Sequence, residues 1–230
     1  MSEAHLFPGL CLPHRDHREG GGRRRPPLAG GDVLRLTPSK NPPSAPQQKR
    51  PAVFLDRDGT INEEMGYIND LSRFRLLPEA ASAIRRLNDA GIPVVVVTNQ
   101  SGAARGYFPA TLVDEVHRHL RDLLARAGAH VDAIYTCLHG PEAGCSCRKP
   151  QPGLLLRAAR DLNLEVSRSY LVGDRYTDIE TAANAGVQGI LVLTGYGLGE
   201  YKHFHDQSRL KPVQVAATLL DAVEYILSHI

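Results

Sequence analysis

Two aspartates stand two positions apart in Asp56-Arg57-Asp58, directly after a short apolar run that we expect to form a strand. Carboxylates this close repel one another, and a fold has no structural reason to place them together at a strand end. A hard divalent cation removes the repulsion, and Mg²⁺ commonly uses a few carboxylates together with phosphate oxygens. Asp174 follows another apolar run and offers a third carboxylate. The three residues therefore predict a magnesium site.

The same pair of aspartates is suited to phosphoryl transfer. With its charge screened by the metal, the Asp56 carboxylate can attack phosphorus and form an aspartyl-phosphate, which divides one difficult displacement into two easier ones. Asp58 can protonate the leaving alcohol and afterwards take a proton from the attacking water. We expect the pKa of Asp58 to be raised so that it can serve in both roles.

Three of the four cysteines fall within eleven residues, in the arrangement Cys137-x-His139-x₅-Cys145-x-Cys147. Three thiolates and an imidazole are the ligand set of a closed tetrahedral zinc site, which would hold the shape of a loop rich in glycine and proline. A loop without metal is the alternative. Because clustered cysteines differ from the spread of a secreted disulfide framework, we expect a reducing, cytoplasmic setting.

The segments that must position these residues alternate between short apolar runs and helical stretches. We expect strands at 52–55, 92–97, 131–136, 169–172 and 188–193, and helices at 78–90, 109–127, 152–162, 176–185 and near 213–227. The β-branched run 92–97 shows no alternation, which is typical of a strand buried on both faces of a parallel sheet. The pattern predicts a doubly wound, Rossmann-like α/β domain over residues 51–230 with a mostly parallel sheet. Ligands bind beyond the carboxyl ends of such strands, where Asp56, Thr98, Cys137 and Asp174 are expected.

Residues 1–50 differ from the rest of the chain in composition. They hold eight of the sixteen prolines and nine Lys/Arg against four Asp/Glu, a balance of +5, whereas residues 51–230 hold eighteen against twenty-one, a balance of −3. Such a segment is predicted to be a disordered extension. A nucleic-acid- or partner-binding arm is disfavoured because no aromatic residues interleave with the basic ones; a solvated extension, or a start codon assigned too far upstream, is preferred. No stretch approaches the roughly 20 apolar residues that span a bilayer, so we expect no membrane association.

Residues 54–62 resemble the first signature of the haloacid-dehalogenase (HAD) phosphatases, two aspartates around one residue followed by glycine and threonine. Segments similar to the later signatures follow in order at predicted strand ends: Thr98-Asn99-Gln100, Arg148-Lys149-Pro150, and Gly173-Asp174 with Asp178. The resemblance implies a HAD-like fold with a magnesium-dependent phosphatase activity. It implies phosphate binding by Thr98, a fixed positive charge from Lys149, and metal binding or orientation of the site by Asp178, roles that suit the stabilisation of phosphoryl oxygens.

The cysteine cluster, followed at once by Arg148-Lys149-Pro150, is similar to a zinc-bearing subgroup that includes D-glycero-D-manno-heptose 1,7-bisphosphate phosphatases. The resemblance covers about residues 51–195, with Leu138 and Gly140 at places where the subgroup commonly has Pro-His-His-Pro, and with a short loop to Cys145. The spacings between signatures leave no room for a large cap domain, so we expect an open site that recognises its substrate with loops. The candidate substrate-binding residues are Asn99, Gln100, Arg105 and Arg148, and the two arginines suit a second phosphate.

The subgroup's known role implies removal of the C7 phosphate from a heptose 1,7-bisphosphate, by a protein that we expect to be monomeric. Histidinol-phosphate phosphatase is the nearest rival, because relatives share the whole catalytic frame. A nucleic-acid 3′-phosphatase or binding protein is the rival from another class. The acidic balance of residues 51–230 argues against it, so no nucleic-acid partner is expected.

Overall fold

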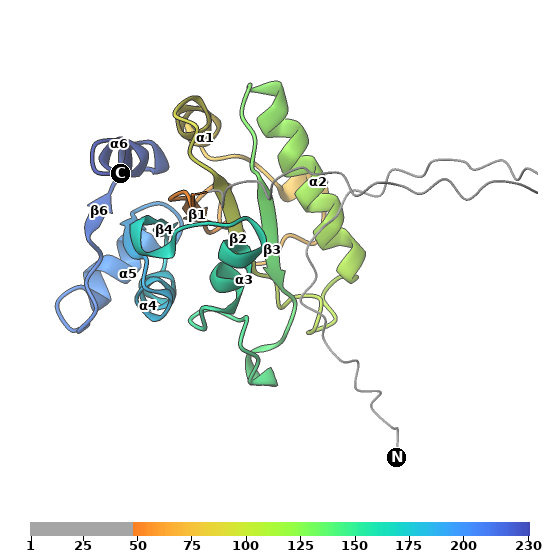
Figure 1. The fold of residues 1–230 in the computed structure, drawn as a ribbon. Helices are drawn as coiled ribbons and strands as arrows, with labels where there is room; N and C mark the ends of the chain where they lie inside the picture. Colours follow the sequence, from red (N-terminus) through yellow and green to blue (C-terminus); the bar gives the residue numbers. More distant parts are fainter. Residues whose placement is uncertain (1–47) are drawn as a thin grey trace, which may run out of the picture. The chain divides into compact units, whose positions relative to one another are not determined.

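A six-stranded parallel sheet runs through the part of the chain that the computed structural model describes, residues 48–230 (Figure 1). The strand order is β3-β2-β1-β4-β5-β6, which is typical of the doubly wound α/β domain predicted from the sequence. The strands are β1 Val53–Leu55, β2 Val94–Asn99, β3 Ala133–Cys137, β4 Tyr170–Gly173, β5 Gln188–Val192 and β6 Gln214–Ala216.

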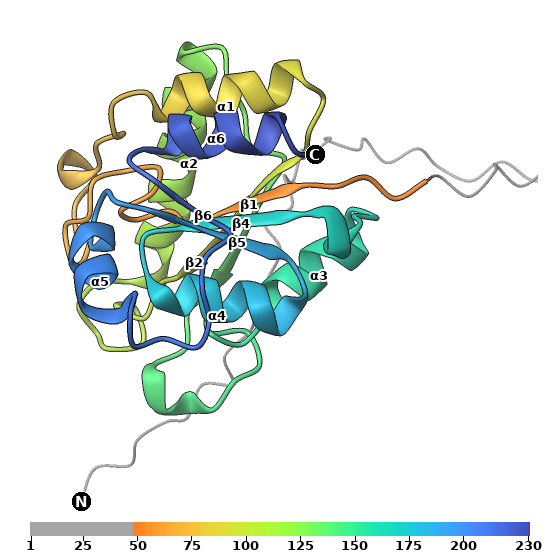
Figure 2. The ribbon, with the colours of Figure 1, turned by 90° about the vertical axis from the view of Figure 1, so that its left-hand side faces the viewer.

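Six α-helices accompany the strands, and within the described residues they form two layers (Figure 2). Helices α1, α2 and α6 cover one face of the sheet, and α3 and α4 cover the other. Helix α5 packs beside α4, where Tyr201 packs against a small buried cluster of Tyr176, Ile179 and Leu191. The helices are α1 Ala80–Asp89, α2 Ala110–Arg126, α3 Gly153–Asp161, α4 Tyr176–Ala185, α5 Gly197–Phe204 and α6 Leu219–Leu227; short 3₁₀ turns lie at Leu71–Arg73, Pro141–Ala143 and Val166–Arg168.

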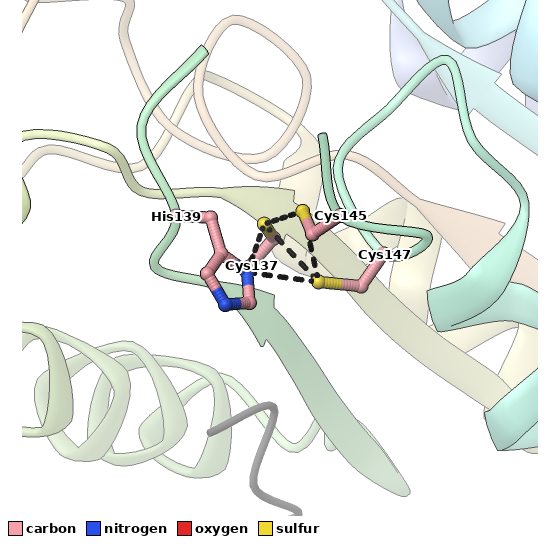
Figure 3. A group of neighbouring side chains, drawn as sticks. All are labelled: Cys137, His139, Cys145 and Cys147. Atoms are coloured by element: carbon pink, nitrogen blue, oxygen red, sulfur yellow. Dashed lines mark hydrogen bonds between the residues drawn. The ribbon is translucent and has the colours of Figure 1, made fainter. Parts of the chain in front are cut away.

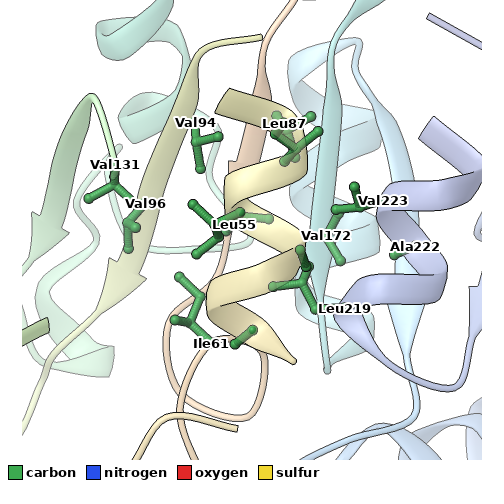
Figure 4. Close-up of a cluster of buried hydrophobic side chains, with 14 of the residues drawn as sticks. Leu55, Ile61, Leu87, Val94, Val96, Val131, Val172, Leu219, Ala222 and Val223 are labelled. Carbon is green, nitrogen blue, oxygen red and sulfur yellow. The ribbon is translucent and has the colours of Figure 1, made fainter. Parts of the chain in front are cut away.

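Alternate side chains of the central strands divide the core between the two layers. Val53 and Leu55 face the cluster under α1 and α6, where Leu87 and Val223 meet them (Figure 4), whereas Phe54 faces the cluster under α3 and α4. All three residues of β1 are buried, as expected for a strand with helices on both faces. Truncating one of these side chains to alanine typically costs about 2–5 kcal/mol, so this core strongly stabilises the strands that carry the site.

The prediction that no large cap domain is present is confirmed within the described residues. The segment between β1 and β2 contains α1 and one 3₁₀ turn, and the segment between β2 and β3 contains α2. Backbone pairing begins at Arg50, which bridges to Leu164. The prediction of a disordered extension concerns mainly residues 1–47, which lie outside the described residues.

The prediction for the C-terminal segment was partly wrong. Instead of one helix from about 213, the chain forms the edge strand β6 and then α6, which begins after the capping box of Thr218 and Asp221. Helix α5 was missed, because Gly197 and Gly199 lower its helix propensity. None of the helices in residues 48–230 has both the length and the apolar character needed to cross a membrane.

Candidate active site at the strand ends

Two of the predicted acidic residues meet where the winding of the sheet reverses. Asp56 follows β1 and Asp174 follows β4, and these strands pair directly, with Leu55 opposite Val172. Strands β2 and β3 extend from β1 in one direction, and β5 and β6 extend from β4 in the other. A doubly wound sheet opens a crevice at this switch point, beyond the carboxyl ends of the strands. The topology therefore brings the two carboxylates together.

Three buried carboxylates form a group that could hold a metal ion. Single carboxylate oxygens of Asp56, Asp174 and Asp178 lie within 4.8 Å of one another. Asp174 Oδ1 is buried without a hydrogen-bond partner, while Oδ2 accepts a bond from the backbone N–H of Tyr196. Burial and neighbouring carboxylates raise the pKa of Asp174 to about 8. Mg²⁺ is bound by oxygen ligands, commonly carboxylates. The clustered carboxylates, one of which has a buried oxygen without a hydrogen bond, therefore fit that ion.

Lys149 is the cation of this cluster, as the sequence predicted. Its ammonium lies 2.8 Å from Asp56 Oδ1 and 2.5 Å from Asp178 Oδ1, and the residue is only 5% exposed. Burial alone would lower the pKa of Lys149, but the two carboxylates outweigh it and raise that pKa. The pKa of Asp56 is about 6, because burial outweighs the opposing effect of Lys149. Asp178 therefore holds Lys149 in place against Asp56.

Asp58 departs from the prediction in two respects. Its carboxylate does not join the group of three; it accepts bonds from both Nε and Nη2 of Arg57, and further bonds from the amides of Asn62 and Gln100. Burial would raise the pKa of Asp58, but the Arg57 charge and these hydrogen bonds lower it. The expectation of a raised pKa was wrong, because the buried arginine between the two aspartates was not considered.

Asn99 and Gln100, predicted to bind substrate, use their amides within the protein. Asn99 bonds to both the backbone N–H and the carbonyl of Lys149, and so fixes the peptide that carries the lysine. The Gln100 amide nitrogen donates to Asp58 Oδ2 at 2.8 Å and to Thr98 Oγ1 at 2.9 Å. Both residues therefore support the groups around them.

A cleft of about 330 Å³ lies over these residues. Thr98, Arg105 and Arg148 line it, as predicted, and Asn99 contributes to its wall. The sequence reasoning missed Arg175 and Tyr196, which face the cleft with the guanidinium 3.9 Å from the ring centroid. Arg175 follows the strand-end residue Asp174 directly, and that position was the available signal. The complete lining is Asp56, Asp58, Glu64, Gly66, Tyr67, Thr98, Asn99, Ser101, Arg105, Arg148, Lys149, Arg175, Thr177 and Tyr196.

The four predicted zinc ligands converge after β3 (Figure 3). The sulfur atoms of Cys137, Cys145 and Cys147 lie 3.3–3.7 Å apart, and His139 Nδ1 is 3.2 Å from Cys147 Sγ. Ligands placed about 2.3 Å from a shared zinc ion in a tetrahedron lie roughly 3.8 Å apart, so the arrangement fits that ion. Burial raises the pKa of Cys137 to about 11, whereas at Cys145 hydrogen bonds with Cys147 and backbone groups outweigh burial and lower the pKa to about 7. Zinc binding would convert the thiols to thiolates.

The cysteine loop leads directly into the active site. Arg148 and Lys149 are the two residues after Cys147, and the Arg148 guanidinium bonds to the His139 carbonyl. The Gly153 N–H donates to the Ser146 carbonyl, and added side-chain atoms at Gly153 would strike that carbonyl. The position of Lys149 is therefore tied to the shape of the loop.

Comparison with known proteins places this chain among phosphatases. A HAD-hydrolase-like family model matches residues 146–222. The D-glycero-D-manno-heptose-1,7-bisphosphate 7-phosphatase of Thermosynechococcus vestitus is 46% identical over 196 residues, covering 79% of this chain and 97% of that protein. The D-glycero-beta-D-manno-heptose-1,7-bisphosphate 7-phosphatase of Pseudomonas aeruginosa is 42% identical over 150 residues, covering 65% and 84%.

A solved structure shares both the fold and much of the sequence. The D,D-heptose 1,7-bisphosphate phosphatase from B. bronchiseptica, complexed with magnesium and phosphate, superposes with a TM-score of 0.72 at 36% identity, covering 78% of this chain and 99% of that one. The shared architecture is the parallel sheet with its flanking helices.

Proposed function

This chain belongs to the HAD-like hydrolases, in the family of the D-glycero-D-manno-heptose-1,7-bisphosphate 7-phosphatases, and from that premise we propose that it hydrolyses the C7 phosphate ester of heptose 1,7-bisphosphate. One observation carries the proposal. The buried Asp56, Asp174, Asp178 and Lys149 meet at the switch point of the sheet, beneath a cleft lined by arginines.

Asp56 is the proposed nucleophile. Its carboxylate oxygen forms a bond to phosphorus while the bond from phosphorus to the C7 oxygen breaks. Mg²⁺ held by Asp56 and Asp174 would supply charge neutralisation for the phosphoryl oxygens. Lys149 keeps a fixed positive charge 2.8 Å from Asp56 Oδ1, and Thr98 lines the cleft where its hydroxyl can donate to phosphoryl oxygens.

Asp58 is the proposed acid and base. It donates a proton to the departing C7 oxygen, then accepts a proton from the water that attacks the aspartyl-phosphate and releases inorganic phosphate. The lowered pKa of Asp58 favours the carboxylate form, which the second step uses directly, so for the first step Asp58 must take up a proton from solvent before the C7 oxygen leaves.

Arginines in the cleft are the proposed determinants of a bisphosphate substrate. Arg105 comes from the loop after β2, Arg148 from the cysteine loop, and Arg175 from the N-cap of α4. Guanidinium groups bind phosphate through paired hydrogen bonds, so cations from three elements suit a second phosphate beyond the one transferred. Zinc bound by the cysteine loop, a monomeric state and a cytoplasmic location remain predictions that accompany this function.

The test is phosphate release with Mg²⁺ from both heptose 1,7-bisphosphate anomers, fructose 1,6-bisphosphate, histidinol phosphate and a 3′-phosphorylated oligonucleotide. We expect a heptose preference of at least about a hundredfold in kcat/KM, roughly 2.7 kcal/mol of transition-state discrimination. A preference for histidinol phosphate or for the oligonucleotide would identify that compound, and not the heptose bisphosphate, as the substrate. A flat profile would indicate a general phosphatase.

A further inference from the structure

Arg57 is a cation buried at the base of the active site between the two aspartates, with only 1% of its surface exposed. Its Nη2 lies 2.9 and 2.7 Å from the two oxygens of Asp58, and its Nε is 3.2 Å from Oδ1. A buried guanidinium is costly unless all its donors are used, and a fork on a carboxylate fixes both distance and plane. The guanidinium therefore determines where the Asp58 carboxylate sits.

His117 approaches the same guanidinium from the opposite side. It lies in the middle of α2, 3% exposed, among the buried apolar residues Val113, Val116 and Leu120. Its Nε2 is 3.3 Å from Arg57 Nη1. An arginine can only donate, so Nε2 is the acceptor in this contact. His117 thus connects the guanidinium to the α2 scaffold.

We propose that Arg57 and His117 are positioning residues for Asp58: the guanidinium holds the carboxylate against the leaving-group side of the cleft, and His117 anchors the guanidinium to α2. This inference rests on the proposed function, in which Asp58 protonates the leaving oxygen. Proton transfer depends steeply on donor placement, so a loosened carboxylate loses rate while substrate binding persists. Asn62 and Gln100 hold single oxygens of Asp58, and neither supplies the two-oxygen grip of Arg57.

The experiment compares two leaving groups. A sugar alcohol leaves only when protonated, whereas p-nitrophenolate leaves readily without a proton. Arg57→Lys keeps the buried charge but loses the fork, and we expect its first-turnover rate with heptose bisphosphate to fall by about 10²-fold with KM nearly unchanged. With p-nitrophenyl phosphate the first-turnover release of p-nitrophenolate should fall by less than about threefold on the same reasoning.

Four further variants make the outcome decisive. Asp58→Asn is the reference for a lost acid and should show the same leaving-group selectivity. His117→Leu should reproduce part of the Arg57→Lys defect. His117→Gln keeps a hydrogen-bond acceptor and should restore the rate. Arg86→Lys, on the surface, should match the wild type. Equal losses on both substrates, or no loss, in Arg57→Lys would overturn the positioning role. If Asp58→Asn shows no selectivity, the acid assignment itself fails and the positioning role falls with it, although the nucleophile and the phosphatase activity would stand.

Discussion

Lys149 and the carboxylates around it compensate one another's charges. The Lys149 ammonium is nearly inaccessible to solvent, and its charge is compensated by Asp56 and Asp178. The charge of each carboxylate is in turn compensated by the ammonium or by a bound metal. Removing one partner of such a set leaves the other buried without compensation, which costs several kcal/mol. The effect of a substitution at this scale therefore depends on which partners remain.

Asp56→Asn should abolish turnover and leave the fold intact. The nucleophile is lost, so kcat should fall by at least about 10⁴-fold, but Lys149 keeps its ion pair with Asp178. Phosphate release under Mg²⁺ and the melting temperature are the two measurements. Appreciable hydrolysis by the purified variant would remove Asp56 from the nucleophile role, and a melting temperature far below the wild type would mean that Asp178 alone does not stabilise Lys149.

Arg148→Ala should impair recognition of a bisphosphate more than chemistry. We expect KM for heptose bisphosphate to rise about tenfold or more, with a change of less than about threefold for p-nitrophenyl phosphate, because only the former carries a second phosphate. Arg168→Ala is the matched control, since Arg168 is exposed and pairs with Glu165 outside the cleft. A parallel rise in KM for both substrates would place Arg148 at the transferred phosphate instead.

At the scale of elements, the cysteine loop is placed to support Lys149, one of the proposed catalytic residues. Cys147 and Lys149 are separated by one residue, and Asn99 at the end of β2 holds the Lys149 peptide from the other side. A loop with little regular structure keeps such a position only if cross-links restrict it, and a metal bound by four side chains does so. Loss of zinc should therefore displace Lys149, because a short stretch of backbone joins it to the cysteine loop.

Cys145→Ser should lower zinc content, thermal stability and activity together. The variant removes one of four ligands, and we expect about one zinc per chain in the wild type and well under half of that in the variant. Elemental analysis, melting temperature and kcat are measured side by side. Ser146→Ala, in the same tripeptide, should keep all three values because its carbonyl, not its side chain, accepts the bond from Gly153. Full activity in a zinc-free Cys145→Ser protein would separate the loop from the position of Lys149.

At the scale of the whole domain, magnesium binding should be linked to pH. In the metal-free protein the pKa values of Asp56 and Asp174 are raised from 3.8 to about 6 and about 8. A raised carboxyl pKa means that the folded state holds the proton more tightly than the unfolded state, so this cluster costs stability as pH rises from about 4 to about 8. Mg²⁺ competes with the same protons.

Mg²⁺ should therefore bind more tightly, and raise the melting temperature more, at pH 8 than at pH 6. Removal of about one competing proton predicts at least about a tenfold gain in affinity across that interval. Calorimetric titrations in buffers with different ionisation enthalpies would count the protons released. Asp174→Asn should lose this linkage, and equal affinities at the two pH values in the wild type would contradict the raised pKa values.

The sequence alone determined the scaffold and pointed to most of the proposed reacting groups. Residues 94–97 are consecutive valines, which is typical of a strand buried on both faces of a sheet. Glycines end the helical stretches between such strands, and this alternation of strands and helices predicts a doubly wound domain. Asp56, Thr98 and Asp174 could be identified because parallel strands bring their carboxyl ends to one edge. The candidate zinc ligands could be recognised from residue type and spacing, which are properties of a short segment.

Tertiary structure decided how those groups are held and which neighbours they have. Arg57 lies between two aspartates in the sequence, but its partner His117 is sixty residues away on α2 and becomes a neighbour only when that helix packs on the sheet. Gln100 is forty-two residues from Asp58 along the chain, and its hydrogen bond to that carboxylate adds to the effect of the Arg57 charge in lowering the pKa of Asp58. Residue types and spacing specify what chemistry is available, whereas burial and long-range contacts set charge states, because desolvation and Coulomb energies depend on distances in space rather than along the chain.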